Sequence, residues 1–236
     1  NVVQCKVDRF LLDEENGYVL DPNSLEGYFD NGYDLIVLVN PNNPAGTYVE
    51  RDVLERVLRK VPSKTRVWVD ETYIEYVGSE NSLERFAVTT ENIVICKSMS
   101  KVYALSGLRA GYLCGSSQII ESLRALTPPW NIGLLSQIAA VKALEDSEYY
   151  QGCYKQTHEL RFKLSTDLME MANVDVINGF ANFLLCKIPP TGPVTTELVE
   201  KCRIRGLYIR NVAITSPRLG ERMFRVAVKD EETNNR

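Results

Sequence analysis

The chain has 236 residues, with 27 Lys and Arg against 31 Asp and Glu and a formal net charge of −4. Its 44% hydrophobic and 25% charged residues are typical of a globular protein, and the length suits one large domain plus part of a second. The acidic balance offers no basic stripe for nucleic acid, and no apolar run approaches the ~20 residues that cross a bilayer. These properties argue against a nucleic-acid partner and against a membrane protein.

Cysteine and histidine usage argues against a metal centre. The six cysteines are far apart, with no C-x-x-C pair, so neither a zinc site nor a disulfide framework is predicted. We expect them to be reduced, small buried residues in a cytoplasmic protein. The single histidine, His158, excludes a His-rich site and is expected on a solvated helix face.

The first part of the chain alternates short β-branched runs with helical patterns, as parallel α/β folds do. A helix is predicted over Glu50–Lys60, where apolar residues form one stripe and Pro62 follows the end. Trp68 lies inside a buried-strand pattern and is expected in the core. The predicted strands are Val2–Val7, Asp34–Val39, Arg66–Asp70, Asn92–Cys96 and a weaker Ala110–Cys114.

The pattern is helical from Gly133 to about Met171, with a break near Ser147–Gly152. Beyond it, four short strands surround one helix, Val194–Arg203, as in a small α+β domain. We therefore expect part of a large α/β domain over 1–130, a connecting helical region over 131–172 and a small C-terminal domain over 173–236. The four strands are predicted at Val174–Ile177, Asn182–Ile188, Leu207–Arg210 and Met223–Val228.

Two polar segments follow predicted strands, at the sheet edge where open α/β sheets bind ligands. In Asn40–Gly46, two prolines and a glycine form a stiff turn that would fix asparagine amides at that edge. The alternative is a plain strand-to-helix turn. Asp70 ends a buried strand, where a carboxylate needs a cation or donors, and Tyr73 can reach the same cavity. For Asp70 the alternative is a helix N-cap.

Two further segments carry cationic side chains. The loop 97–112 brings Ser98, Ser100, Lys101 and Arg109 together between apolar strands, a combination that can clamp a phosphate. A lysine beside that positive charge has its pKa pushed down and becomes a usable amine nucleophile. A solvated loop is the alternative. Arg225 alternates with Phe224 and Val226 along a strand, where a surface position is the alternative.

Together and in this order, these segments resemble the pyridoxal-phosphate enzymes of fold type I, in the histidinol-phosphate aminotransferase and threonine-phosphate decarboxylase group. The resemblance runs from Val3 to Asn235 and rests on Asn-Pro-x-Asn-Pro-x-Gly, Asp-Glu-x-Tyr and Ser-x-Ser-Lys-x-x-x-Leu-x-Gly-Leu-Arg-x-Gly-Tyr. It implies an aspartate aminotransferase-like α/β fold with a mostly parallel sheet. It also implies pyridoxal 5'-phosphate as cofactor and a cytoplasmic homodimer active in amino-acid biosynthesis.

The resemblance implies roles around the cofactor ring. Lys101 would form a Schiff base with the cofactor aldehyde and later move a proton between the substrate and the cofactor. Asp70 would pair with the ring nitrogen and keep it protonated, as expected of such enzymes. Asn43 and Tyr73 would hydrogen-bond the phenolate oxygen of the ring.

Other roles concern anions. By the same resemblance, Ser98, Ser100 and Arg109 would hold the cofactor phosphate. Arg225 corresponds to the arginine that grips the substrate carboxylate, for which a guanidinium fork is suited. Asn182 matches a small-domain motif near the substrate.

The sequence departs from the family pattern in several places. Ala45 stands where a threonine is usual and Thr72 where an alanine is usual, and neither is expected to matter to the chemistry. Roughly the first third of a family member has no counterpart, including a strand expected between Val2–Val7 and Asp34–Val39. The last helix, Glu231–Arg236, also looks short. We therefore expect a fragment of a longer chain, with impaired cofactor binding if 236 residues were the whole protein.

The reaction stays open between transamination and decarboxylation. A Pro-Pro-Trp-Asn turn at 128–131 and Lys229, where a glycine is more usual, favour the decarboxylase relative. Transamination is preferred because aminotransferases are the larger class. The resemblance implies a small, phosphorylated amino compound and a keto acid as substrates. A non-catalytic domain that senses the cofactor, or a degenerate remnant, is the alternative of another class.

Overall fold

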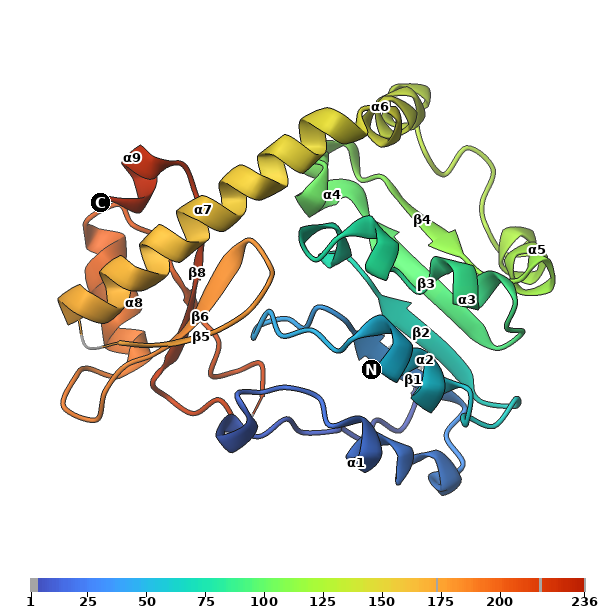
Figure 1. Cartoon of the computed structure of the whole chain (residues 1–236), viewed down its shortest axis with the longest axis horizontal. Helices are drawn as coiled ribbons and strands as arrows, with labels where there is room; N and C mark the ends of the chain where they lie inside the picture. Colours follow the sequence, from blue (N-terminus) through green and yellow to red (C-terminus); the bar gives the residue numbers. More distant parts are fainter. Residues whose placement is uncertain (1–3, 173, 217, 236) are drawn as a thin grey trace.

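The computed structural model describes residues 4–172, 174–216 and 218–235, which form two sheets joined by a long helix (Figure 1). Sheet A has the order β1-β2-β3-β4. The first three strands are parallel and β4 is antiparallel to β3, so the prediction of a mostly parallel sheet is confirmed. The strands are β1 (Leu35–Val39), β2 (Arg66–Asp70), β3 (Ile93–Ser98) and β4 (Gly111–Cys114).

One face of sheet A is packed and the other is open. Helix α2 confirms the predicted helix and buries Leu54 and Leu58 against the β2 and β3 side chains of the main core. On the opposite face Val37 is 59% exposed, and Trp68, its partner in the β1–β2 register, is only half-buried. The expectation that Trp68 lies in the core is therefore wrong, because no layer of the described chain covers this face.

Short helices lie before, between and after the strands of sheet A. Their bounds are α1 (Pro22–Glu26), α2 (Arg51–Leu58), α3 (Glu84–Val88), α4 (Met99–Val102) and α5 (Ser117–Ala125). Single 3₁₀ turns lie at η1 (Glu14–Asn16), η2 (Phe29–Asn31), η3 (Ile74–Tyr76), η4 (Ser79–Asn81) and η5 (Ser106–Leu108).

The predicted strand Val2–Val7 is not formed over its described part. Residues 4–7 are exposed and irregular, while Val2 and Val3 lie outside the described residues. An alternating run makes a strand only where a neighbouring strand offers hydrogen bonds, and residues 4–7 pair with no strand of sheet A. The segment instead runs from sheet A to sheet B, where Arg218 pairs with Asp13 at 2.6 Å (Figure 1).

The predicted helical stretch is confirmed as α6 (Leu134–Glu145) and α7 (Ser147–Ala172), but the break lies at Asp146 and not near Ser147–Gly152, which form the first turns of α7. Helix α7 runs from the α4 end of sheet A across to sheet B (Figure 1). On its way His158 Nε2 lies 2.8 Å from the Tyr76 carbonyl, and the imidazole is half-buried. The expected solvated position of His158 is wrong because α7 packs over the turn that contains Tyr76. No helix among the described residues combines the length and apolar character needed to cross a membrane.

Sheet B is antiparallel, with the order β5-β6-β8-β7. Its core joins Leu184 and Phe224 of the sheet to Leu164 of α7. The four predicted strands are confirmed, although the strand expected at Leu207–Arg210 is reduced to Arg210–Asn211. The elements are β5 (Asp175–Ile177), β6 (Phe183–Lys187), α8 (Thr195–Ile204), β7 (Arg210–Asn211), β8 (Met223–Ala227) and α9 (Glu231–Asn234).

Candidate functional site

The loop after β1 is held rigidly by its first asparagine. The buried amide of Asn40 donates to the Val49 carbonyl at 3.0 Å and accepts from the Val49 amide at 2.8 Å. Gly46, with φ +74°, closes the turn, and its carbonyl accepts from the Phe180 amide at 2.8 Å. The loop that carries Asn43 is thereby fixed both to sheet A and to the start of the sheet B part.

Asp70 lies at the carboxyl end of β2 and has local donors. Its Oδ1 accepts from the Thr72 amide at 2.9 Å and from the Thr72 hydroxyl at 2.5 Å. Burial, and then the charge of Asp70, raise the pKa of the Cys96 thiol on the neighbouring strand. Thr72 therefore contacts the candidate carboxylate directly, and the expectation that a threonine here does not affect the chemistry stays a prediction.

Tyr73 is buried against sheet B. Its ring packs edge-on against Phe183, with centroids 5.2 Å apart. Burial raises the pKa of Tyr73, while attraction to the charge of Arg225 acts in the opposite direction. The phenol thus faces the small sheet from the end of β2, and the cavity that it would share with Asp70 stays a prediction.

Serine and arginine side chains converge at the β3–β4 connection. Ser98 Oγ caps α4 by accepting from the Ser100 amide at 3.3 Å, and Arg109 Nη1 donates to Ser100 Oγ at 3.2 Å. A cavity of about 230 Å³ is lined by Ser98, Ser100 and Arg109 together with neighbouring strand residues. Lys101 lies exposed on α4 and forms no ion pair with any described residue. Three donors around one cavity make a site for an anion.

Arg225 joins the two sheets at the site. From β8 its Nη1 donates to Asn43 Oδ1 at 2.7 Å, and its guanidinium lies 4.7 Å from the Phe183 ring centroid. Partial burial lowers the pKa of Arg225, and the nearby Arg210 acts in the same direction. Two residues 182 positions apart in sequence are therefore in contact.

Arg210 is a residue that sequence reasoning missed. It is the register partner of Arg225 across β7 and β8, and partners in an antiparallel pair project from the same face. The sequence signal for Arg210 was a second arginine on a short strand of the small sheet. This signal is too weak to identify a site residue. Asn182 is not brought into the cluster by any side-chain hydrogen bond among the described residues, and its carbonyl accepts from the Val228 amide at 2.9 Å.

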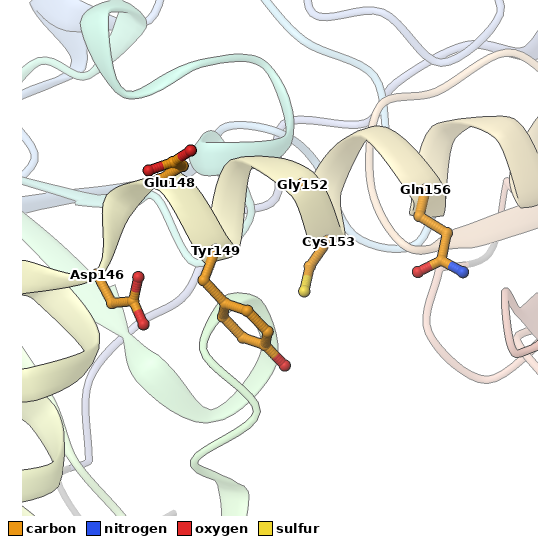
Figure 2. Close-up of a pocket in the computed structure, with 6 residues that line it drawn as sticks. All are labelled: Asp146, Glu148, Tyr149, Gly152, Cys153 and Gln156. Atoms are coloured by element: carbon orange, nitrogen blue, oxygen red, sulfur yellow. The ribbon is translucent and has the colours of Figure 1, made fainter.

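A larger hollow of about 520 Å³ lies at the α6–α7 corner, away from these residues (Figure 2). Asp146, Tyr149 and Cys153 project from the same side of the helix there. Tyr149 is 61% exposed, so this is an open surface feature, and none of the residues singled out from the sequence lines it. The sheet edge is therefore the better candidate site.

Comparison with known proteins gives relatives over nearly the whole chain. Histidinol-phosphate aminotransferase from Methanococcus maripaludis (strain C6 / ATCC BAA-1332) is 29% identical over 225 residues, covering 95% of this chain and 60% of the relative. The structure of histidinol-phosphate aminotransferase from Clostridium acetobutylicum superposes with a TM-score of 0.86 and 25% identity, over 95% of this chain and 66% of the other. A decarboxylase from Sulfurospirillum multivorans gives a TM-score of 0.85 and 26% identity, over 96% and 66%.

The chain thus spans about 60% of the length of the curated relative from Methanococcus. The sequence pattern of the family described as aminotransferase class I and II matches residues 1–236. This match covers every element described above, including both sheets and the residues at their shared edge. The chain belongs to the aminotransferase class I and II family.

Proposed function

We propose that this chain is the pyridoxal-phosphate-binding part of an aminotransferase that acts on a small phosphorylated amino compound, as in the histidinol-phosphate aminotransferases. One observation carries the proposal: the amine of Lys101 lies on the helix that begins at the anion-binding serines, one strand away from Asp70. An aldehyde cofactor with a phosphate and a ring nitrogen requires an amine, an anion site and a carboxylate at one sheet edge.

The side chains present fit this cofactor. Ser98, Ser100 and Arg109 would bind its phosphate, since the arginine and one serine already converge at 3.2 Å. The carboxylate of Asp70 would hold a proton at the ring nitrogen. When bound, pyridoxal phosphate supplies an aldehyde that takes up the amino group and a ring that withdraws electrons.

Three further side chains would act on the ring oxygen and the substrate. The Asn43 amide and the Tyr73 hydroxyl would hydrogen-bond the phenolate oxygen. The Lys101 amine would accept the proton from the substrate α-carbon and deliver it to the carbon of the cofactor that carried the aldehyde, as a positioned general base and acid.

Two arginines suit the anionic groups of the substrate. Arg225 would bind a carboxylate through its guanidinium fork, and Arg210 adds a second positive charge on the same face. Two guanidinium groups on one face can bind two anionic groups, so they suit substrates that carry a carboxylate and a phosphate between them. Asn182 would lie beside this substrate region.

Decarboxylation is the second candidate reaction. The structural likeness to the Sulfurospirillum decarboxylase is as close as that to the Clostridium aminotransferase, and Lys229 follows β8 where the aminotransferase pattern has glycine. Both reactions use the same side chains and differ in how the substrate is oriented.

We also propose two domains, with boundaries near residues 130 and 173, and a homodimer. Light scattering on the full-length protein checks the dimer, since a monomeric mass would contradict it.

The reaction is tested with full-length protein loaded with pyridoxal phosphate. Histidinol phosphate or threonine phosphate is added without keto acid, while cofactor absorbance and CO₂ release are followed together. Conversion of the cofactor to its amino form without CO₂ establishes transamination, and CO₂ release with the original absorbance restored establishes decarboxylation. Lys101→Arg keeps the charge and should abolish both signals, so full activity in this variant would refute the role of Lys101.

A further inference from the structure

A charged cluster lies in the core directly behind the candidate site. The side chains of β2 and β3 that face the core are aliphatic except at the carboxyl ends of the two strands. There the core-facing side chains are Lys97 of β3 and Glu71, the residue that follows β2. Glu71 is 0% and Lys97 is 4% exposed, in a layer otherwise made of aliphatic side chains. Charged groups this deep in a protein cost free energy unless they are paired, so their partners define what the cluster does.

Lys97 joins three elements through its amine. Its Nζ lies 3.0 Å from Glu75 Oε1, 3.5 Å from Glu84 Oε2 and 3.8 Å from Glu71 Oε2. Glu75 belongs to the η3 turn, Glu84 begins α3 and Glu71 continues β2. A single cation on β3 therefore ties together the turn after Asp70, the next helix and the neighbouring strand.

Glu71 has its own donors in addition to the lysine. Its oxygens accept from the Ser82 hydroxyl at 2.5 Å and from the Leu83 amide at 2.8 Å. Its main chain is tied as well, because the Glu71 amide donates to the Cys96 carbonyl at 2.9 Å. Both the side chain and the backbone of this residue are thus fixed against β3 and the segment before α3.

The balance of charges supports a stable, closed cluster. Burial acts to lower the pKa of Lys97, but attraction to its three carboxylates outweighs burial and the pKa is raised. Burial raises the pKa of Glu71 to about 7, so part of the excess negative charge is neutralised near neutral pH. The other titratable groups that face the cluster are Tyr48, Tyr76, Tyr103, Tyr112, Cys114 and Tyr154.

We propose that Lys97 is a positioning residue for the cofactor site. Its ion pairs with Glu71, Glu75 and Glu84, on the core side of the sheet, hold in place the strand ends that carry the site residues. This inference rests on the proposed function. Side chains alternate along a strand, so Lys97 points away from the face that carries Ser98, and Glu71 away from the face that carries Asp70. A clamp between Lys97 and the glutamates therefore fixes the distance between the carboxylate and the anion-binding serines, and Lys97 also forms part of the wall of the 230 Å³ cavity beside them.

The test compares ion-pair removal at constant net charge. Lys97→Met with Glu75→Leu removes one cation and one anion and replaces them with apolar side chains of similar volume, although it also leaves Glu71 and Glu84 without their cation. The same exchange at the exposed pair of Lys60 and Glu26, 2.7 Å apart, is the matched control. Lys97→Arg keeps the charge and tests rescue.

Two readouts are measured on full-length protein: the dissociation constant for pyridoxal phosphate added to the cofactor-free form, and the pH midpoint of bound-cofactor absorbance. We expect the double variant to bind about tenfold more weakly and to shift the midpoint, because small misplacements of site groups are costly. Lys97→Arg and the control should stay near wild type. A double variant with wild-type affinity and midpoint would overturn the positioning role.

The failures are distinguishable. A wild-type protein that binds no cofactor refutes the proposed function and this inference with it, whereas equal binding by wild type and the double variant refutes the inference alone. If the double variant does not fold, the single variant Glu75→Leu tests the positioning role of Lys97. This single variant leaves Lys97 paired with two carboxylates but releases the η3 turn, so we expect it to bind pyridoxal phosphate about threefold more weakly. Binding as tight as that of the wild type would contradict the positioning role.

Discussion

The buried carboxyl of Glu71 makes the stability of the protein depend on pH in an unusual direction. Burial raises its pKa from 4.5 to about 7, so the folded state holds this proton more tightly than the unfolded state. Between these two values the unfolded chain releases the proton first, and stability therefore falls as the pH rises. A shift of this size corresponds to about 3 kcal/mol, all of it lost above the folded pKa.

Glu71→Gln should flatten this dependence, because an amide carries no titrating proton and can still bond Ser82 and Leu83. We expect the variant to gain stability over wild type as the pH rises from 5 to 8, measured as the free energy of unfolding in urea at each pH. Glu145→Gln, an exposed position on α6, is the control. Parallel curves for wild type and Glu71→Gln would contradict the pKa assignment.

Several site residues could be located from the sequence because their motifs have a recognisable order. Asn43, Asp70 and Tyr73 were named this way, although no pattern announces that Asn43 touches Arg225 at 2.7 Å. Arg210 carries no motif and becomes visible only through its register with Arg225. Contacts between side chains depend on how strands and turns are placed, which a linear pattern does not encode.

At the scale of elements, the two sheets meet through a close backbone contact. The loop at Gly46 and the turn at Gly179 approach so tightly that a Cβ on Gly179 would lie 2.7 Å from the Ala45 carbonyl oxygen. The neighbouring Phe180 amide donates to Gly46 across this contact. Only a residue without a side chain fits here.

Gly179→Ala should therefore lower the free energy of unfolding by about 2 kcal/mol, since backbone atoms must move apart to accept the methyl group. Gly152→Ala is the matched control, because it lies inside α7 with no neighbouring atom within 4 Å of the new Cβ. That change should stabilise by up to about 1 kcal/mol through helix propensity. Urea unfolding midpoints measure both, and equal effects would disprove the close-contact argument.

Most elements could be predicted because local pattern and burial agree. The helices around Asp146 and the strands of sheet B show a clear period, and their positions are confirmed within a few residues. The strand predicted at Val2–Val7 does not form over its described part, because a strand needs a neighbouring strand to pair with. That pairing is set by the tertiary structure and not by the local sequence. The direction of β4 was also not given by its apolar residues, since parallel and antiparallel strands share that composition.

For the whole molecule, the proposed homodimer has a natural surface on α6. Apolar side chains along this helix are exposed, and Leu135 is 79% accessible. A contiguous exposed patch of this kind marks an interaction site, and we expect a second copy of the protein to cover it. The exposed apolar residues of the helix are Leu134, Leu135, Ile138, Val141 and Leu144.

Leu135→Glu should weaken this dimer about a hundredfold, because association would bury an unpaired charge. Tyr208→Glu is the control, since Tyr208 is 81% exposed but lies beside sheet B. Light scattering over a concentration series of full-length protein measures the mass of each. A Leu135→Glu variant that dimerises like wild type would place the interface elsewhere.

Helix α7 is so long that a small tilt at one end displaces the other end substantially. Its 26 residues rise about 39 Å, so a tilt of about 5° at the Asp146 junction displaces its far end by about 3 Å. Sheet B packs on that far end and would move with it. A displacement of that size exceeds what the 2.7 Å contact between Arg225 and Asn43 can absorb. Such a tilt would separate Arg225 from Asn43, and it would also draw His158 of α7 away from the Tyr76 carbonyl, 2.8 Å from its Nε2, so a movement of sheet B is coupled to the turn after β2.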